Sequence, residues 1–279
     1  MLPNYTPHPS PQFHAENFGF EEIDHIAIAC QAGTTSSIID WYSRSFRFNR
    51  IVISGQEDKD KGLEIFGKKS GLRIKTIMSS KDNQTKSTKL FGVNLVFVEP
   101  INVDEPGQVA TVGNFLIDRP KKKKQRNEAR GKKNGIPEKT KQNFQFLRHH
   151  SGPGVQHVAL YTNAIIDTVK KIKGRNVATI SVPPNYYEMM FEIVPISHEI
   201  RKCYSKDLRE LSILFDFQQD PETKKFMFEK YLLQTFTDSM CDRKTYFLEI
   251  IQRHQTDGFG HRNITALFKC VEELHKNHQ

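Results

Sequence analysis

Apolar and polar residues alternate along several short segments of the chain, which is the pattern of strands that bury one face. One such strand begins at Glu22 and crosses His25. The alternation predicts further strands at residues 50–54, 63–66, 71–78, 93–98, 154–161, 177–182, 211–217, 230–236 and 245–252. Helical spacing predicts helices at 36–45, at 165–173 and, amphipathically, at 263–275. Residues 186–192 and 195–204 fit either a helix or irregular structure.

Two parts of the chain repeat each other. The sequence IDHIAIA at residues 23–29 resembles VQHVALY at 155–161, and Ile-Ile-Asp follows each of them, at 38–40 and 165–167. Because side chains of a strand point alternately to its two faces, each copy directs one histidine, His25 or His157, in an equivalent direction. The sequence therefore predicts an α+β protein of two βαβββ repeats, which form an open, barrel-like sheet closed by the C-terminal helix.

Proline sets the first residues apart from the rest. Pro3, Pro7, Pro9 and Pro11 predict an extended linker over residues 1–18, followed by one domain over residues 19–279. Within the domain we expect repeat one at about 19–100, a Lys-rich insertion at about 101–141, and repeat two with the C-terminal helix at about 142–279.

The excess of basic residues lies in one segment. Residues 119–141, RPKKKKQRNEARGKKNGIPEKTK, hold eleven lysines and arginines against two acids, an excess equal to the net charge of +9. This segment lacks the aromatic residues that nucleic-acid-binding surfaces interleave with basic ones. We therefore expect a solvated loop and no nucleic-acid binding, while a docking, targeting or polyanion-binding role stays open.

The remaining composition is typical of a globular protein. Hydrophobic residues make up 37% of the 279 residues, which is enough for a core. No apolar run approaches the ~18 residues that a membrane helix needs. The cysteines lie far apart, at Cys30, Cys203, Cys241 and Cys270, which favours a reduced intracellular compartment over a disulfide scaffold. The N-terminus has neither the basic nor the apolar region of a secretory signal.

Glu249 is the polar residue that most needs an explanation, because residues 246–251 are otherwise apolar. Burying an unpaired carboxylate costs several kcal/mol, so Glu249 needs a cation or strong donors. An arginine would meet that need, and histidines in strands are commonly hydrogen-bonded core residues. The alternative joins Glu249 to His25 and His157 as the two-histidine, one-carboxylate triad of non-haem Fe(II) oxygenases, which leaves coordination positions open.

A second group of residues is typical of a binding wall. Gln234 and Phe236 share one face of a predicted strand, which places a polar group beside an aromatic ring, an arrangement that suits a ligand-binding wall. Phe259 and Asn263 stand at the entrance to the final predicted helix, where they would form a lid. Plain core packing of Phe236, with Gln234 at a sheet edge, and core packing of Phe259 stay open.

Several motifs in matching order resemble the 4-hydroxyphenylpyruvate dioxygenase family of the vicinal-oxygen-chelate superfamily, from about Gly19 to the C-terminus. They are GPGVQHVALYT at 152–162, the Tyr186-Tyr187 pair, YLLQTFT at 231–237, and DRKTYFLEIIQRH at 242–254 followed by GFG at 258–260. The resemblance implies a sheet around Fe(II), held by His25, His157 and Glu249. It implies an α-keto acid that chelates the iron, with O2 as co-substrate, and a pocket lined by Gln142, Gln156, Gln234, Phe236, Phe259, Asn263 and Ile264.

Departures from the family pattern bear on the product. Arg262-Asn263-Ile264 stands where homogentisate-forming members read Gly-Asn-Phe, and Ile74 follows Leu72-Arg73 where they carry a serine. In having an aliphatic residue at position 264, the chain resembles the 4-hydroxymandelate synthases. We therefore expect Ile264, together with Gln234, to act in catalysis. The resemblance implies a dioxygenase that makes 4-hydroxymandelate and CO2 from 4-hydroxyphenylpyruvate, in aromatic-acid or quinone-ring metabolism.

Two other functions stay open. One is the same enzyme type making homogentisate in tyrosine breakdown. The other is a non-catalytic fragment that acts as a binding module, because family members have a further N-terminal module of two similar repeats. The resemblance to animal members implies a mitochondrial location, with the cytoplasm as the alternative, and a homo-oligomer is compatible with the sequence.

Overall fold

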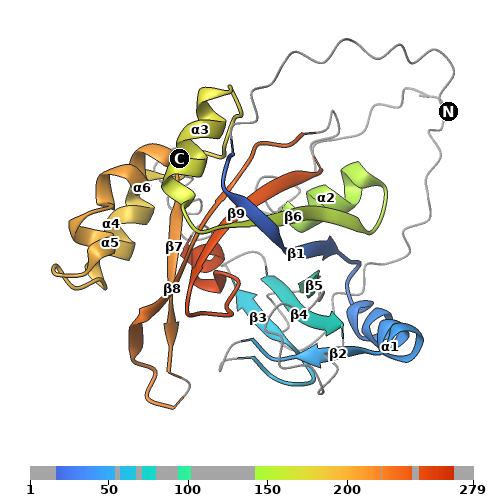
Figure 1. Cartoon of the computed structure of the whole chain (residues 1–279). Coiled ribbons are helices and arrows are strands. Elements are labelled where there is room, and N and C mark those ends of the chain that lie inside the picture. Colours follow the sequence, from blue (N-terminus) through green and yellow to red (C-terminus); the bar gives the residue numbers. More distant parts are fainter. Residues whose placement is uncertain are drawn as a thin grey trace, which may run out of the picture.

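The sheet of the protein curls into an open half-barrel, with helices packed mainly on its outside (Figure 1). The computed structural model describes residues 17–53, 57–66, 71–79, 94–101, 142–220, 222–240 and 245–266. In this part of the chain one sheet of nine strands has the order β2-β4-β5-β1-β6-β9-β8-β7, with β3 also paired to β4. The elements are β1 (Phe20–Ala29), α1 (Thr35–Phe46), β2 (Phe48–Ile51), β3 (Leu63–Phe66), β4 (Gly71–Ser79), β5 (Asn94–Ile101), α2 (Gln142–His150), β6 (Gly154–Thr162), α3 (Ile165–Gly174), α4 (Pro184–Glu192), α5 (Glu199–Lys202), α6 (Ser205–Leu211), β7 (Leu214–Gln219), β8 (Phe226–Phe236) and β9 (Phe247–His254).

The two halves of the sheet have the same arrangement. β1 pairs in parallel with β5, and β6 pairs in parallel with β9. β4 lies antiparallel to β5 as β8 lies antiparallel to β9. β1 and β6 are antiparallel neighbours and join the halves. This arrangement confirms the predicted fold class, two βαβββ repeats in one open sheet.

The outer edge of the first half is divided between two short strands. β2 pairs with residues 76–79 of β4, and β3 pairs with residues 71–74. Together they take the position that β7 alone takes in the second half. Four strands therefore follow α1, as the alternation along the sequence predicts, instead of the three of an ideal repeat.

Helices cover the outer face of each half (Figure 1). α1 packs on the first half, where Ile39 joins a cluster with Phe97 of β5. α3 to α6 pack on the second half, where Val169, Tyr187 and Phe215 belong to the largest core cluster. α3 buries residues at helical spacing, so its amphipathic pattern explains why it lies on the sheet.

The inner face of the first half is aliphatic. Its cluster contains Ala27, Ile65, Ile74, Val96 and Val98. Phe259 and Ile264 pack against this cluster, and residues 261–266 are helical. The predicted helix at 263–275 is thus described only at its start, and its remainder lies outside the described residues.

Some predicted elements differ from the structure. Residues 177–182 do not form a ladder strand: they contribute an isolated bridge between Thr179 and Thr237, and α4 begins directly afterwards at Pro184. The strand predicted at 211–217 begins only at Leu214, because Leu211 ends α6. The chain between α3 and β7 contains α4, α5 and α6, a helical insertion that the first half lacks.

Two further sequence predictions fall largely outside the described residues. Residues 1–16 of the predicted linker and the Lys-rich segment at 119–141 are not described. Phe18, at the end of the predicted linker, packs against the large core cluster. Among the described helices, none has the length and apolar character needed to cross a membrane.

Candidate metal centre

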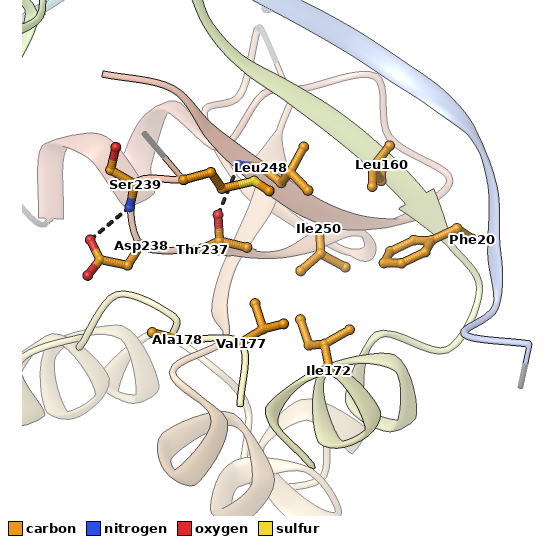
Figure 2. Close-up of a pocket in the computed structure, with 11 residues that line it drawn as sticks. Phe20, Leu160, Ile172, Val177, Ala178, Thr237, Asp238, Ser239, Leu248 and Ile250 are labelled. Carbon is orange, nitrogen blue, oxygen red and sulfur yellow. Dashed lines mark hydrogen bonds between the residues drawn. The ribbon is translucent and has the colours of Figure 1, made fainter. Parts of the chain in front are cut away.

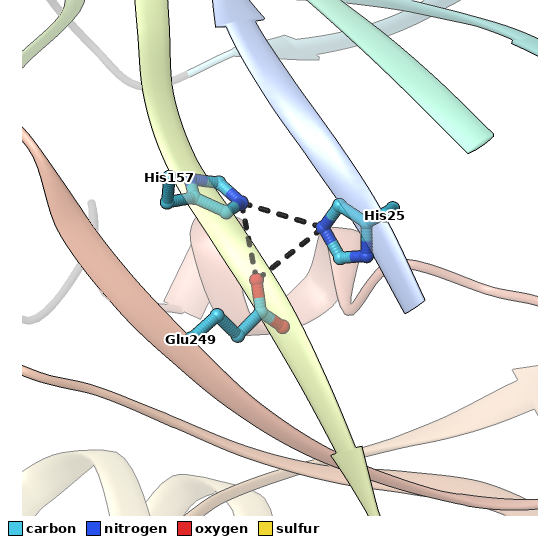
Figure 3. Close-up of side chains that lie close together, drawn as sticks. All are labelled: His25, His157 and Glu249. Atoms are coloured by element: carbon cyan, nitrogen blue, oxygen red, sulfur yellow. Dashed lines mark hydrogen bonds and ion pairs between the residues drawn. The ribbon is translucent and has the colours of Figure 1, made fainter. Parts of the chain in front are cut away.

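Three side chains from separate strands meet on the inner side of the sheet (Figure 3). His25 comes from β1, His157 from β6 and Glu249 from β9, and one ligand atom of each lies within 4.8 Å of the others. Glu249 Oε2 is 3.4 Å from His25 Nε2 and 3.2 Å from His157 Nε2. The two Nε2 atoms are 3.3 Å apart. The structure therefore brings together the three residues that the sequence singled out.

The register of the sheet explains why these residues converge. In the β1–β6 ladder, His25 lies opposite Ala159, and Ala27 lies opposite His157. Ala159 is also the partner of Glu249 in the β6–β9 ladder. Small alanine side chains beside the three larger ones leave room for all three on one face, since same-face neighbours lie about 4.5–5.5 Å apart.

A one-residue shift in register precedes each histidine. The β1–β6 ladder skips Asp24 in β1 and Gln156 in β6. Such shifts are typical of β-bulges, which redirect side chains near functional sites. Asp24 consequently reaches the same site as its neighbour His25, although ideal alternation would send it to the other face.

The charges in the triad explain its protonation. Burial raises the pKa of Glu249, but the imidazoles of His25 and His157 outweigh burial and lower that pKa to about 2. Burial lowers the pKa of His25, yet the carboxylates of Glu249 and Asp24 raise it above its ordinary value. Burial dominates at His157 and lowers its pKa. The ionised carboxylate of Glu249 thus faces both imidazoles, where a metal ion would compete with protons for the same ligand atoms.

In the described part of the chain Glu249 forms ion pairs with His25 and His157, and no arginine pairs with it. The nearest arginine on β9, Arg253, instead pairs with Asp24, with Nε 2.6 Å from Asp24 Oδ2 and Nη2 2.8 Å from Oδ1. Asp24 in turn lies 2.7 Å from His25 Nδ1. The sequence predicts neither Asp24 nor Arg253 as a site residue, although Asp24 directly precedes His25 and that position indicates a possible partner for the histidine.

Aromatic rings surround the two histidines. The ring of His157 stacks on Phe247 at 4.9 Å and lies 6.3 Å from Phe236. The ring of His25 lies 4.7 Å from Phe259 in an edge-to-face contact. The structure thus places the predicted wall residues Phe236 and Phe259 beside the triad, and adds Phe247, which the sequence does not predict there.

Polar atoms without partners are buried in the same region. Gln234 is 2% exposed and Asn263 is fully buried, and Gln234 Oε1 and Asn263 Nδ2 have no hydrogen-bond partner among the described residues. Asn263 Oδ1 accepts a hydrogen bond of 2.6 Å from the Tyr186 hydroxyl. Gly260, with φ of +68°, packs so closely on Gln234 that a Cβ there would lie 2.2 Å from Oε1. Unsatisfied buried polar atoms such as these call for a ligand or water.

The other predicted pocket residues, Ile264, Gln156 and Gln142, lie on three separate elements of the fold. Ile264 packs with Phe259 on the aliphatic inner cluster. Gln156 is buried at the register shift next to His157. Gln142 is the first residue of α2, and its side chain lies outside the described residues.

A separate pocket of about 340 Å³ lies on the opposite face of the sheet (Figure 2). Its walls include Leu248 and Ile250, which flank Glu249 in β9 and therefore point away from the triad. Ile172 of α3 closes another side. None of the predicted site residues lines this pocket.

Comparison with known proteins finds 4-hydroxyphenylpyruvate dioxygenases among the relatives of the chain. No protein-family model matches the chain. The chain is 39% identical over 137 residues to 4-hydroxyphenylpyruvate dioxygenase of Yarrowia lipolytica, covering 49% of this chain and 32% of that protein. It is 33% identical over 256 residues to the same enzyme of Sus scrofa, covering 91% and 50%. It is 28% identical over 253 residues to the 4-hydroxyphenylpyruvate dioxygenase-like protein of Rattus norvegicus, covering 90% and 55%. The chain therefore spans at most about half the length of these relatives.

Two solved structures align with the chain over most of its length. A triple mutant of 4-hydroxymandelate synthase from Streptomyces coelicolor aligns with a TM-score of 0.56 and 26% identity, covering 92% of this chain and 55% of that one. A xylose isomerase-like TIM barrel/4-hydroxyphenylpyruvate dioxygenase fusion protein aligns with a TM-score of 0.51 and 16% identity, covering 91% and 29%, and shows the fold alone.

Proposed function

The chain belongs to the 4-hydroxyphenylpyruvate dioxygenase family, and from this premise we propose that it is an Fe(II)-dependent dioxygenase of 4-hydroxyphenylpyruvate that forms 4-hydroxymandelate and CO2. One observation carries the proposal: Nε2 of His25, Nε2 of His157 and Oε2 of Glu249 converge in a buried position, with no arginine or lysine pairing with Glu249 in the described residues. Two imidazoles and a carboxylate on one side of a metal ion leave positions open for other ligands.

The donor set fits a divalent iron. Nitrogen and carboxylate oxygen ligands suit Fe(II), and the low pKa of Glu249 keeps this ligand ionised. When bound, Fe(II) would supply the redox chemistry that activates O2 and decarboxylates the keto acid. The protein's part is to hold the keto acid in position and to exclude water, which the rings of Phe236, Phe247 and Phe259 do around the centre.

The unpaired polar atoms of Gln234 and Asn263 match the other end of this substrate. A phenol hydroxyl donates one hydrogen bond and accepts others. Gln234 Oε1 offers an acceptor and Asn263 Nδ2 offers a donor, and Gly260 on Gln234 stands three residues before Asn263. Binding the phenol would satisfy both atoms, so these two side chains orient the aryl group relative to the metal.

The choice of product rests on Ile264. Its packing beside Phe259, which contacts the ring of His25, supports a place at the wall of the substrate pocket. A branched aliphatic side chain there leaves the benzylic carbon, rather than the ring, free to meet the oxidant. Formation of homogentisate by the same centre is the second candidate, because the named relatives include 4-hydroxyphenylpyruvate dioxygenases.

The proposal is tested by loading the purified chain with Fe(II), adding 4-hydroxyphenylpyruvate and O2, and identifying the product by chromatography and mass spectrometry. Formation of 4-hydroxymandelate with release of one CO2 per turnover supports the proposal. Homogentisate would replace it with the second candidate. Tight iron binding without turnover would favour a role as a binding module.

A further inference from the structure

The two histidines of the centre differ in how they are held. Each follows a residue that the β1–β6 ladder skips, Asp24 before His25 and Gln156 before His157. The Asp24 carboxylate lies 2.7 Å from His25 Nδ1, whereas His157 Nδ1 has no hydrogen-bond partner within the described part of the chain. The two histidines are therefore equivalent in the repeat, but only His25 has a hydrogen-bond partner at Nδ1 within the described residues.

The contact between Asp24 and His25 fixes the tautomer of His25. An ionised carboxylate only accepts hydrogen bonds, so Nδ1 of His25 must carry the proton that is donated to Asp24. Nε2 is then the nitrogen that faces Glu249 and His157. Ligating histidines are typically oriented in this way by a partner on the other ring nitrogen.

Arg253 holds Asp24 with a two-pronged ion pair. Its Nε and Nη2 lie 2.6 and 2.8 Å from the two carboxylate oxygens. The guanidinium is rigid and planar, so both oxygens are fixed in orientation as well as in distance. The side chain of Asp24 is 9% exposed and that of Arg253 is 16% exposed, which limits competition from water.

The same guanidinium also holds the segment that carries Phe259. Arg253 Nη1 donates to the backbone oxygens of Thr256, at 3.3 Å, and of Gly258. Its Cζ lies 5.2 Å from the centre of the Phe259 ring. Phe259 in turn packs edge-to-face on the His25 ring at 4.7 Å. One side chain therefore contacts both the support of a ligand and the aromatic group that covers that ligand.

We infer that Arg253, acting through Asp24, is a positioning residue that sets the orientation of His25 for metal binding and keeps Phe259 over the His25 ring. This inference rests on the proposed metal centre. It is independent of which product the enzyme forms, because it concerns the metal-ligand geometry before any reaction.

The experiment measures Co(II) binding to Asp24→Asn and Arg253→Lys proteins by titration, using the absorption of bound cobalt as the signal. Asp24→Asn keeps the shape of the side chain but removes its charge. Arg253→Lys keeps the positive charge but cannot bond both carboxylate oxygens of Asp24 through a planar guanidinium. Each variant is expected to raise the dissociation constant about tenfold to 100-fold, the usual effect of losing a partner behind a metal ligand.

Arg73→Lys is the matched control. Arg73 is also a buried arginine, and it bridges Glu64 and Glu99 on neighbouring strands with contacts of 2.6 and 3.1 Å. Neither carboxylate belongs to the triad. Thermal unfolding of the metal-free proteins shows whether each variant folds, and Arg73→Lys is expected to lose stability while its cobalt affinity stays within about threefold of the wild type.

A second readout does not depend on affinity. In the Co(II) protein, proton NMR resolves the shifted ring N–H signals of the ligating histidines, and exchange into D2O measures their protection. The Nδ1–H of His25 is expected to exchange at least about tenfold faster in Asp24→Asn than in the wild type, because the buried ion pair no longer shields it.

The outcomes separate this inference from the proposed function. A wild-type protein that binds no Co(II) would overturn the metal centre and the inference together. A wild type that binds Co(II), with folded Asp24→Asn and Arg253→Lys variants of equal affinity and unchanged N–H exchange, would overturn the positioning role alone.

Discussion

The Nε2 atoms of His25 and His157 lie 3.3 Å apart, although the two residues belong to different repeats of the chain. They face each other across the antiparallel join between β1 and β6, where His25 is opposite Ala159 and Ala27 is opposite His157. Two equivalent strands that meet antiparallel bring equivalent side chains together near their local symmetry axis. The repeat thus creates a pair of candidate metal ligands from one strand motif.

The carboxylate breaks this symmetry. Asn94 is the β5 partner of His25, and Phe247 is the β9 partner of His157. Two residues further along each strand stand Val96 and Glu249. Val96 belongs to the aliphatic inner cluster. One half of the sheet therefore supplies the carboxylate of the candidate metal centre, and the corresponding position of the other half supplies an apolar side chain.

Removing one member of the triad should abolish stoichiometric iron binding. In His157→Ala or Glu249→Ala, only two protein ligands remain, so we expect the Fe(II) dissociation constant to rise more than ~100-fold, beyond the effect of losing an outer partner. Equilibrium dialysis with metal analysis measures this. His254→Ala is the control, because His254 is exposed at the end of the same strand and stacks on Tyr231. Full iron occupancy in either triad variant would contradict the assignment.

The main parts of the centre could be predicted from the sequence because they depend on strand periodicity. His25 and His157 stand at equivalent places in two visible repeats, and Glu249 interrupts an apolar run. The register shifts at Asp24 and Gln156 could not be predicted, since a one-residue bulge leaves no distinctive composition. The contact of Arg253 with Asp24 depends on those shifts and was missed for the same reason.

The helical insertion in the second half shows a different limit. The sequence presents the Tyr186-Tyr187 pair only as a motif, and residues 186–192 fit either a helix or irregular structure. In the fold both tyrosines are buried in α4 and bond to other elements, Tyr186 to Asn263 and Tyr187 to the backbone oxygen of Leu208. Tertiary contacts of this kind decide short segments whose local pattern is ambiguous.

Gly260→Ala should disturb the pocket wall. Gly260 has φ of +68°, and an added Cβ would lie 2.2 Å from Gln234 Oε1. A left-handed backbone costs a residue with a side chain roughly 1–2 kcal/mol, and the displaced Gln234 should raise the KM for 4-hydroxyphenylpyruvate. Chemical denaturation and steady-state kinetics measure the two effects. Gly258→Ala is the matched control, because its nearest neighbour, Thr256 Oγ1, lies at 3.6 Å. Equal KM values in the two variants would show that Gln234 does not contact substrate.

Cys30 should be unreactive toward thiol reagents at neutral pH. Burial, followed by the charge of Glu99, raises the pKa of Cys30 to about 12. The thiolate is the reactive form, so its fraction at pH 8 falls about 1,000-fold below that of an ordinary cysteine. Cys203 is exposed. With a chromogenic disulfide reagent, Cys203→Ser should remove one rapidly reacting thiol and Cys30→Ser should remove none. Loss of a fast thiol in Cys30→Ser would mean that the core between α1 and the sheet opens readily.

A substitution at Ile264 tests whether this side chain determines which product forms. Its backbone N–H donates to Gly260 O at 3.2 Å, so the start of the final helix and the glycine against Gln234 form one short turn. Its side chain packs beside Phe259 on the inner cluster. A phenylalanine at position 264 is larger and flat, and it would confine the aryl ring of the substrate closer to the metal.

We expect the wild type to form chiefly 4-hydroxymandelate and Ile264→Phe to shift measurably toward ring-hydroxylated products. A difference of only ~1.4 kcal/mol between the barriers for benzylic and ring attack changes the product ratio tenfold, so one side chain is sufficient. Ile264→Leu serves as the control, because it keeps an aliphatic side chain of the same volume and should leave the ratio within about threefold of the wild type. Chromatography of the three reaction mixtures gives the ratios directly. Two outcomes would contradict this prediction: a wild type that forms mainly homogentisate, or an Ile264→Leu variant that shifts the ratio as far as Ile264→Phe does. Either would show that the choice between an aliphatic and an aromatic side chain at position 264 does not control where the substrate is attacked.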